Sequence, residues 1–183
     1  MNKLQKLSPE KYIITKGSQL PFHECFINEN WLEEGMASIT ISKKMPSDKL
    51  IIGAYVVDIF CLGLKNTLFK FALDTNEYAS FLEQISKQQE LVKCDLAEAH
   101  NIIYGAIDYA ESIGFKPQKD FRITEFLLDS DLINDGIDEI EFGKNGKPFY
   151  FAGPYDNTKQ IIGILEKNVG KDNFEFSLPI DGF

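Results

Sequence analysis

The chain is poor in the residues that most often build metal sites and nucleic-acid contacts. Among its 183 residues it has one arginine, Arg122, and only two histidines, His23 and His100. Arginine suits bidentate contacts with guanine and phosphate, and a zinc site takes four ligands from histidine, cysteine or carboxylate side chains. We therefore expect no bound metal.

The chain also lacks positive charge. It carries 19 Lys plus Arg against 28 Asp plus Glu, which gives a formal net charge of −9. Codon preference for lysine would explain the arginine shortage by itself, so the total charge is the stronger argument. Nucleic-acid binders normally present a basic patch that displaces counterions from phosphates. We expect no nucleic-acid partner.

Cysteines are few and widely spaced. Cys25, Cys61 and Cys94 form no C-x-x-C motif, and an odd number leaves one unpaired in any disulfide scheme, so reduced cytoplasmic thiols are expected. The most apolar run, residues 50–64, has 15 residues and includes Asp58. A membrane-spanning helix needs about 20 apolar residues, so we expect neither a signal peptide, a membrane span nor a membrane partner.

Most sequence motifs of known chemistry are missing. There is no G-x-G-x-x-G, no Walker loop at Gly63 and no G-x-S-x-G, so we expect no cofactor. His23 and Glu24 begin like a zinc-protease helix, but Ile27 stands where the second ligand belongs. The segment 129–134 opens like a calcium loop and lacks its glycine. The eight carboxylates of residues 120–141 either attract a basic partner or form a solvated acidic face.

The apolar pattern predicts several strands. Apolar and polar residues alternate over residues 37–43, a turn follows at 45–49, and residues 50–61 are apolar on both faces, as in a central strand. Residues 22–28 and 174–178 are further predicted strands, and 67–73 is either strand or helix. Asn145-Gly146 between alternating apolar residues predicts a hairpin over residues 140–151.

Capping residues predict the helices. Ser8 and Pro9 mark a helix start, and Asp74 with Glu77 and Asp95 with Glu98 form capping-box patterns. We also expect a turn of helix at 30–35, a helix capped by Asp120 and a helix over 157–170. The predicted fold is α+β: a short N-terminal arm over residues 1–20, then one domain over 21–183 in which three to four helices cover a largely antiparallel sheet.

Asp58 is the most informative residue, because a carboxylate within an apolar strand must be paired, hydrogen-bonded or protonated. A catalytic interpretation makes Asp58 a general base beside Lys65, or the residue that orients His23 or His100. A structural interpretation has Asp58 anchor Lys65 or the backbone amides of a bend at Gly63.

Three further side chains are candidate binding residues: Cys25, Cys61 and His100. Cys25 and His23 lie two positions apart on one predicted strand, which puts them on one face about 7 Å apart. Cys61 falls on the face opposite Asp58 unless the chain bends at Gly63. His100 lies at the rim of its helix's apolar stripe with Tyr104 one turn on.

Four segments carry a resemblance: HEC with IN at residues 23–28, VDIFCLGLKN at 57–66, GAIDYAESIGFKPQKDF at 105–121 and IEFGKNGKPFYFAGPYD at 140–156. The chain resembles an uncharacterised family of bacterial proteins over most of its length from residue 21 onward. The resemblance implies no activity, cofactor or partner.

The sequence therefore favours a cytoplasmic binding or interaction module with an unidentified protein or small-molecule partner. The alternative is a small hydrolase or transferase with a site near Asp58 and Lys65, assisted by His23, Cys25 or Cys61. A nuclease would need metal-binding carboxylates and a basic groove, and the net charge disfavours the groove.

Overall fold

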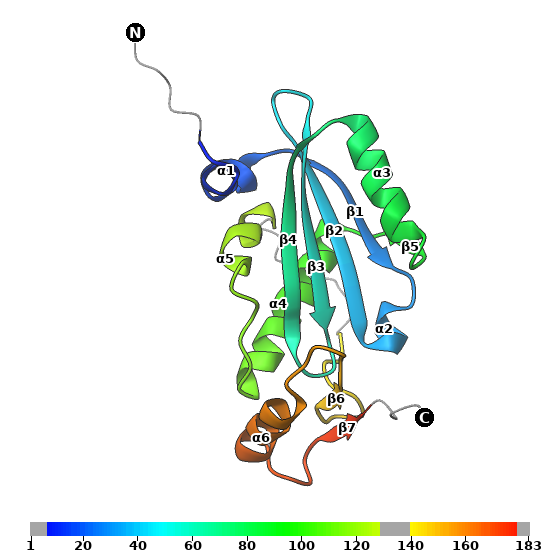
Figure 1. The fold of residues 1–183 in the computed structure, drawn as a ribbon, viewed down its shortest axis with the longest axis vertical. Coiled ribbons are helices and arrows are strands. Elements are labelled where there is room, and N and C mark those ends of the chain that lie inside the picture. Colours follow the sequence, from blue (N-terminus) through cyan, green and yellow to red (C-terminus); the bar gives the residue numbers. More distant parts are fainter. Residues whose placement is uncertain (1–6, 129–139, 179–183) are drawn as a thin grey trace.

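A five-stranded antiparallel sheet forms the centre of the protein (Figure 1). The structure is a computed structural model that describes residues 7–128 and 140–178. The strand order is β4-β3-β2-β1-β5. The strand bounds are β1 Phe22–Asn28, β2 Met36–Lys44, β3 Leu50–Asp58, β4 Gly63–Leu73 and β5 Leu91–Lys93. The predicted α+β class with a largely antiparallel sheet is therefore confirmed.

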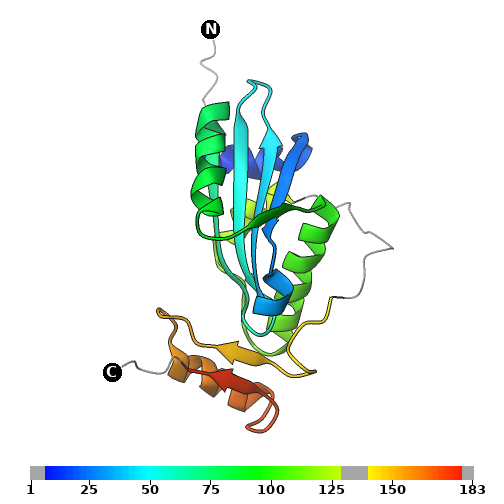
Figure 2. The ribbon, with the colours of Figure 1, turned by 90° about the vertical axis from the view of Figure 1, so that its right-hand side faces the viewer.

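The two long helices cover opposite faces of this sheet. Figure 2 shows the sheet nearly edge-on between α3 (Thr75–Ser86) and α4 (Leu96–Ser112). The face under α4 is the inner face, and the face under α3 is the outer face. Helix α3 lies over one end of the outer face only, where Tyr78, Phe81 and Leu82 pack against Leu50, Ile52 and Leu73.

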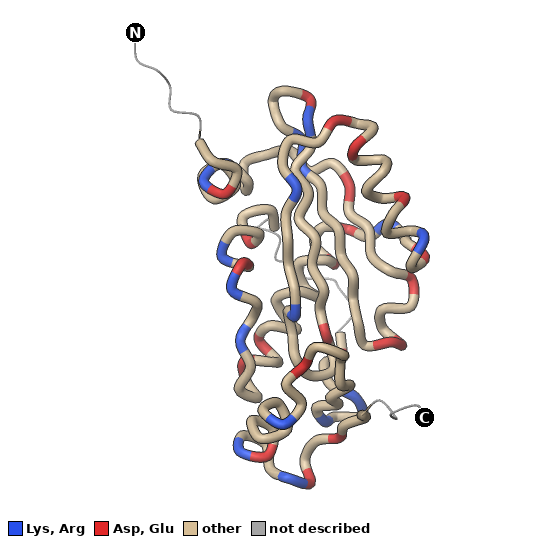
Figure 3. Tube along the Cα trace, in the orientation of Figure 1, with Lys and Arg blue, Asp and Glu red and all other residues tan. Residues whose placement is uncertain are grey.

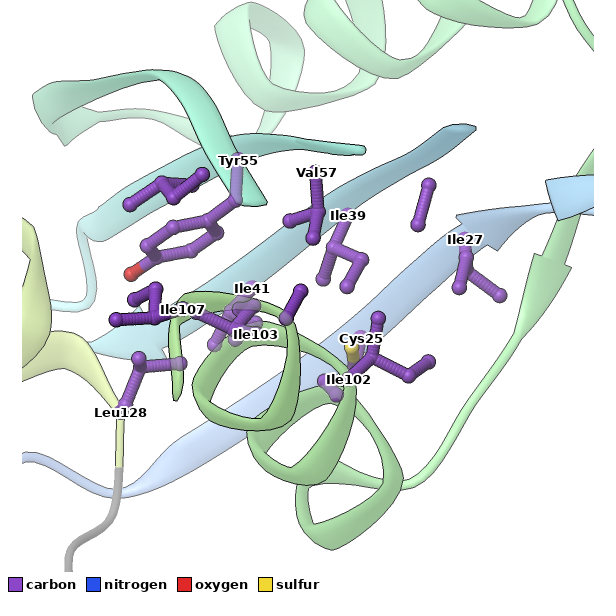
Figure 4. Close-up of a cluster of buried hydrophobic side chains, with 14 of the residues drawn as sticks. Cys25, Ile27, Ile39, Ile41, Tyr55, Val57, Ile102, Ile103, Ile107 and Leu128 are labelled. Carbon is purple, nitrogen blue, oxygen red and sulfur yellow. The ribbon is translucent and has the colours of Figure 1, made fainter. Parts of the chain in front are cut away.

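The main hydrophobic core lies between the inner face and α4 (Figure 4). Alternate residues of β2 and β3 point into it, because successive side chains of a strand point to opposite faces. The labelled side chains are Cys25 and Ile27 of β1, Ile39 and Ile41 of β2, Tyr55 and Val57 of β3, Ile102, Ile103 and Ile107 of α4, and Leu128.

Helix α1 (Pro9–Lys16) belongs to this fold although it lies in the predicted N-terminal arm. Its Ile13 is fully buried against Leu20, Ile51 and Leu127. The short elements η1 (Gly17–Gln19), α2 (Trp31–Glu34), α5 (Phe121–Thr124) and η2 (Glu125–Leu127) complete this part of the chain. Six α-helices are therefore present in the described residues, more than the three to four predicted.

A smaller C-terminal unit sits at the opposite end of the sheet from α1 (Figure 1). It consists of β6 (Phe149–Phe151), α6 (Thr158–Asn168) and β7 (Glu175–Ser177), and β6 pairs parallel to β7. Its core contains Tyr150, Ala152, Leu165 and Phe174 together with Cys61 of the main sheet's turn.

The Asn145-Gly146 turn forms as predicted, with φ of 55° and 75° at its two residues. The hairpin around it is shorter than predicted, because a single bridge between Lys144 and Lys147 closes it. The residues that follow leave this turn and pair with β7 instead. The signal for a turn is local, whereas the choice of β7 as partner depends on residues 26 positions further along the chain, as in the pairing of Phe149 with Glu175.

Most predicted helix starts are correct, but two of the predicted caps do not form. Ser8 accepts from the Lys11 amide, and Asp74 with Glu77 makes the full capping box. Asp95 and Asp120 precede helices without capping them through their side chains.

The segment 67–73, for which the sequence allowed either strand or helix, is part of strand β4. The calcium-like segment 129–134 and five of the eight carboxylates of residues 120–141 lie outside the described residues. Within the described chain, no helix is long and apolar enough to cross a membrane.

Candidate functional site

Asp58 ends strand β3 and is 4% exposed. Its Oδ1 accepts hydrogen bonds from the backbone N–H of Phe60, at 2.9 Å, and of Cys61, at 3.0 Å. Burial raises the pKa of the carboxyl above its ordinary value, and the backbone N–H groups of Leu62, Cys61 and Phe60 offset part of that rise. In the structure Asp58 therefore anchors the backbone of the turn between β3 and β4.

This turn is also where the C-terminal unit attaches to the sheet. The carbonyl of Ile59 accepts from the Gly143 amide at 2.9 Å, and that of Phe60 accepts from the Phe149 amide at 3.1 Å. Gly63 has φ +67°, and a Cβ there would lie 2.8 Å from the Ala106 carbonyl oxygen. Segments 57–66 and 140–156, which both carry the family resemblance, are therefore hydrogen-bonded to each other.

Lys65 of β4 also connects the sheet to the C-terminal part of the chain, through a salt bridge with Asp156. Its Nζ lies 3.2 Å from Asp156 Oδ2, which also accepts from the Gly153 amide and the Tyr150 hydroxyl. Burial alone would raise the pKa of Asp156, but the Gly153 amide and Lys65 hold that pKa below its ordinary value. The charge of Lys65 also lowers the pKa of Asp58, yet its ammonium group binds Asp156.

His23 lies near the opposite end of the sheet from Asp58. Its neighbour Phe22 pairs with Lys43, which pairs with Ile51, seven residues before Asp58. Seven residues of strand span about 23 Å. The pairing of β1 with β2 is irregular between Phe22 and Glu24, and the His23 ring lies 5.8 Å from that of Tyr78. The structure therefore does not bring His23 to Asp58 and Lys65.

Cys25 and Cys94 meet beside His23. Their Sγ atoms lie 2.8 Å apart, with Cys25 on β1 and Cys94 directly after β5. Both line a pocket of about 330 Å³. We call this the thiol pocket; its other lining residues are Phe22, His23, Glu24, Lys93, Asp95 and Glu98. The contact with Cys94 and burial raise the pKa of Cys25 strongly, and Glu98 and Asp95 add to the rise.

The remaining two candidates, Cys61 and His100, are not among the residues that line the thiol pocket. Cys61 is fully buried in the C-terminal core, and burial raises the pKa of its thiol. His100 is half-buried on α4, with its ring 4.4 Å from that of Tyr104. Among the described residues no hydrogen-bond partner reaches its buried Nδ1.

The part of the outer face that α3 leaves uncovered forms a groove of about 340 Å³. We call it the outer groove. Its floor is formed by the strands β2, β3 and β4, and its wall by the end of α3 and the residues just after it. All thirteen lining residues are uncharged: Ser38, Ile39, Thr40, Ala54, Tyr55, Val56, Asn66, Thr67, Leu68, Phe81, Ile85, Gln88 and Gln89.

No residue of the outer groove was among the sequence candidates, although one signal for its floor was visible. The alternation over 37–43 places Ser38 and Thr40 on the face opposite Ile39 and Ile41. That pattern predicted a polar outer face, but it gave no position for α3. The groove depends on where α3 packs on the sheet, at Tyr78, Phe81 and Leu82.

The charged residues surround the outer groove rather than lining it. Figure 3 shows the middle parts of β2, β3 and β4 in tan, with charged positions at the strand ends and on the helices.

Comparisons of the chain with protein-family models, with curated proteins and with solved structures found no match.

Proposed function

We propose that this protein is an interaction module that binds an uncharged peptide segment of a partner protein in the outer groove. The observation that carries the proposal is the uncharged lining of a groove in a chain of net charge −9. A volume of about 340 Å³ is within the range of ligand sites, which starts near 300 Å³.

The lining supplies two kinds of contact that a peptide needs. Val56, Leu68 and Ile85 offer apolar surface for a side chain, and Leu68 is 44% exposed. The amide side chains of Asn66 and Gln88 each carry donors and an acceptor, which match the N–H and C=O groups of a peptide backbone. A charged ligand residue would be desolvated there without an opposite charge, at a cost in binding free energy.

The test is a titration followed by amide chemical shifts. The probe is an acetylated and amidated tripeptide, Ala-Leu-Ala, compared with the same peptide carrying Glu or Lys at its centre. We expect the neutral peptide to shift the amides of Ser38, Val56 and Leu68 and the charged peptides to shift them much less.

Two matched variants locate the binding. Ala54→Phe fills the floor of the groove, and Ala79→Phe makes the same change on the exposed surface of α3 outside the groove. We expect the first variant to lose the shifts and the second to keep them. Equal binding of the charged peptides, or shifts confined to other surfaces, would contradict the proposal.

A further inference from the structure

Cys25 and Cys94 continue the pairing of two strands. Phe26 pairs with Lys93 and Ile27 with Val92, so Cys25 and Cys94 are the next opposed pair. The Cys94 amide donates to the Cys25 carbonyl at 3.2 Å, which is one of the two bonds of a hydrogen-bonded pair. Such pairs have Cα atoms about 5.5 Å apart. That separation is within the range of about 4.4 to 6.8 Å found for disulfides.

The side chains complete this geometry. The two sulfur atoms lie 2.8 Å apart, although the residues are 69 positions apart in the chain. Because the two backbones already lie side by side and share a hydrogen bond, a bond between the sulfurs needs side-chain adjustment and no rearrangement of strands. The third thiol, Cys61, is buried in the other core.

We propose that Cys25 and Cys94 are a redox-active pair that forms a reversible disulfide, with a neutral hydroperoxide as the oxidant. The thiol pocket has three carboxylates, Glu24, Asp95 and Glu98, against the single cation Lys93 and the imidazole of His23. This charge repels anionic oxidants such as oxidised glutathione and leaves hydrogen peroxide unaffected. The proposal is independent of the outer groove and goes beyond the function proposed for it.

The reaction begins at Cys94, because Cys94 is half-buried whereas Cys25 is 3% exposed. The Cys94 thiol loses its proton to solvent, and its sulfur attacks one peroxide oxygen. The O–O bond breaks, an S–OH group forms, and the departing hydroxide takes up a proton to give water.

The Cys25 sulfur then attacks the Cys94 sulfur. The S–O bond breaks, the S–S bond forms, and the hydroxyl leaves with the Cys25 proton as a second water. The two sulfurs together lose two electrons, which reduce the two peroxide oxygens. A dithiol reductant returns the disulfide to two thiols by thiol–disulfide exchange.

The disulfide would fasten a weakly held part of the fold. Strand β5 has three residues, lies at the edge of the sheet and pairs only with β1 in the described structure. Oxidation would tie the end of β5 covalently to β1. We therefore expect slower amide hydrogen exchange over residues 88–94 in the oxidised protein.

The test treats the folded, reduced protein with hydrogen peroxide, blocks free thiols with N-ethylmaleimide under denaturing conditions and measures the mass. We expect a loss of two hydrogen atoms, one remaining blocked thiol, a Cys25–Cys94 linked peptide after digestion, and full reversal by dithiothreitol. The melting temperature of the oxidised protein should rise by several degrees, because the bond closes a long loop.

Cys61→Ser is the matched control and should form the same linked peptide with no thiol left to block. Cys94→Ser should show neither the intramolecular disulfide nor the slower exchange at 88–94. The proposal is overturned if Cys94 is oxidised to sulfinic acid while Cys25 stays free, if the disulfide involves Cys61, or if the link forms only in the unfolded chain.

Discussion

The two faces of strands β2 and β3 differ sharply, although the residues of the two faces alternate along the same two strands. The inner face presents Ile39, Ile41 and Val57, each at most 1% exposed beneath α4. The outer face presents Ser38, Ala54 and Val56 where α3 leaves it uncovered. Burial of apolar side chains drives folding, so we expect the inner face to contribute most to stability. The uncovered part of the outer face lies outside the buried clusters.

The same contrast separates the two groups of candidate residues. Asp58 holds the turn at which the C-terminal unit attaches to the sheet, and Lys65 binds Asp156 next to that unit's helix. Cys25 and Cys94 border a pocket and contact each other. A buried charged residue in the sequence is therefore not by itself a sign of catalysis, because a turn that must be held rigid uses the same chemistry.

Truncation of the inner face should have the largest effect. Ile39→Ala removes a fully buried side chain from the centre of the main core and leaves a cavity against α4. We expect the free energy of unfolding to fall by about 2 to 5 kcal/mol. Urea denaturation measures this, and a loss below about 1 kcal/mol would mean that the inner face is not the main source of stability.

Replacement of Asp58, the carboxylate of the β3–β4 turn, should have the second-largest effect on stability. Asp58→Leu leaves the Phe60 and Cys61 amides without their acceptor and should cost about 1 to 3 kcal/mol. Asp58→Asn keeps an acceptor oxygen and should cost clearly less. Thermal melts of both variants check this, and equal losses in the two would show that the hydrogen bonds are unimportant.

Much of this comparison could be predicted from sequence because its signals are local. The alternation at Ser38 to Ser42 gives both faces of β2, and Asp74 with Glu77 gives the start of α3. The environment of Asp58 as a buried, hydrogen-bonded carboxylate was also one of the predicted alternatives. Such features depend on residues within a few positions of each other.

The rest depends on contacts between distant segments. Cys25 and Cys94 are 69 positions apart, and their pairing requires β5 to join the edge of the sheet beside β1. The salt bridge of Lys65 with Asp156 spans 91 positions. No periodicity in the sequence encodes such pairings, so His23 and Cys25 were grouped with Asp58 although the strands place them far apart.

The Lys65–Asp156 pair should have a smaller effect that depends on pH. The pKa of Asp156 is lowered in the folded protein, so its contribution is present above the unfolded pKa, near 4, and is lost as the pH falls from there through the lower pKa of the folded state. Asp58 has a raised pKa and contributes with the opposite sign. Asp156→Asn should cost about 1 kcal/mol at pH 7.

The same variant should also lose less stability than the wild type between pH 5 and 3, because one carboxylate of lowered pKa is gone. Urea titrations at several pH values measure both effects. Lys65→Met at pH 7 is the control for the pair, and a steeper acid loss in Asp156→Asn would contradict the assignment.

A change on the outer face should have the smallest effect on stability. Ser38→Ala removes a hydroxyl that lines the outer groove, while the Ser38 backbone amide keeps its 2.8 Å bond to Asn28. We expect the free energy of unfolding to change by less than about 0.5 kcal/mol, measured by urea denaturation beside Ile39→Ala. Ser38 and Ile39 are adjacent, so the pair of variants compares the two faces at a single point of β2. A cost for Ser38→Ala close to that for Ile39→Ala would mean that the outer face is part of the folded core, and the groove would then be a packing defect rather than a surface available for a partner.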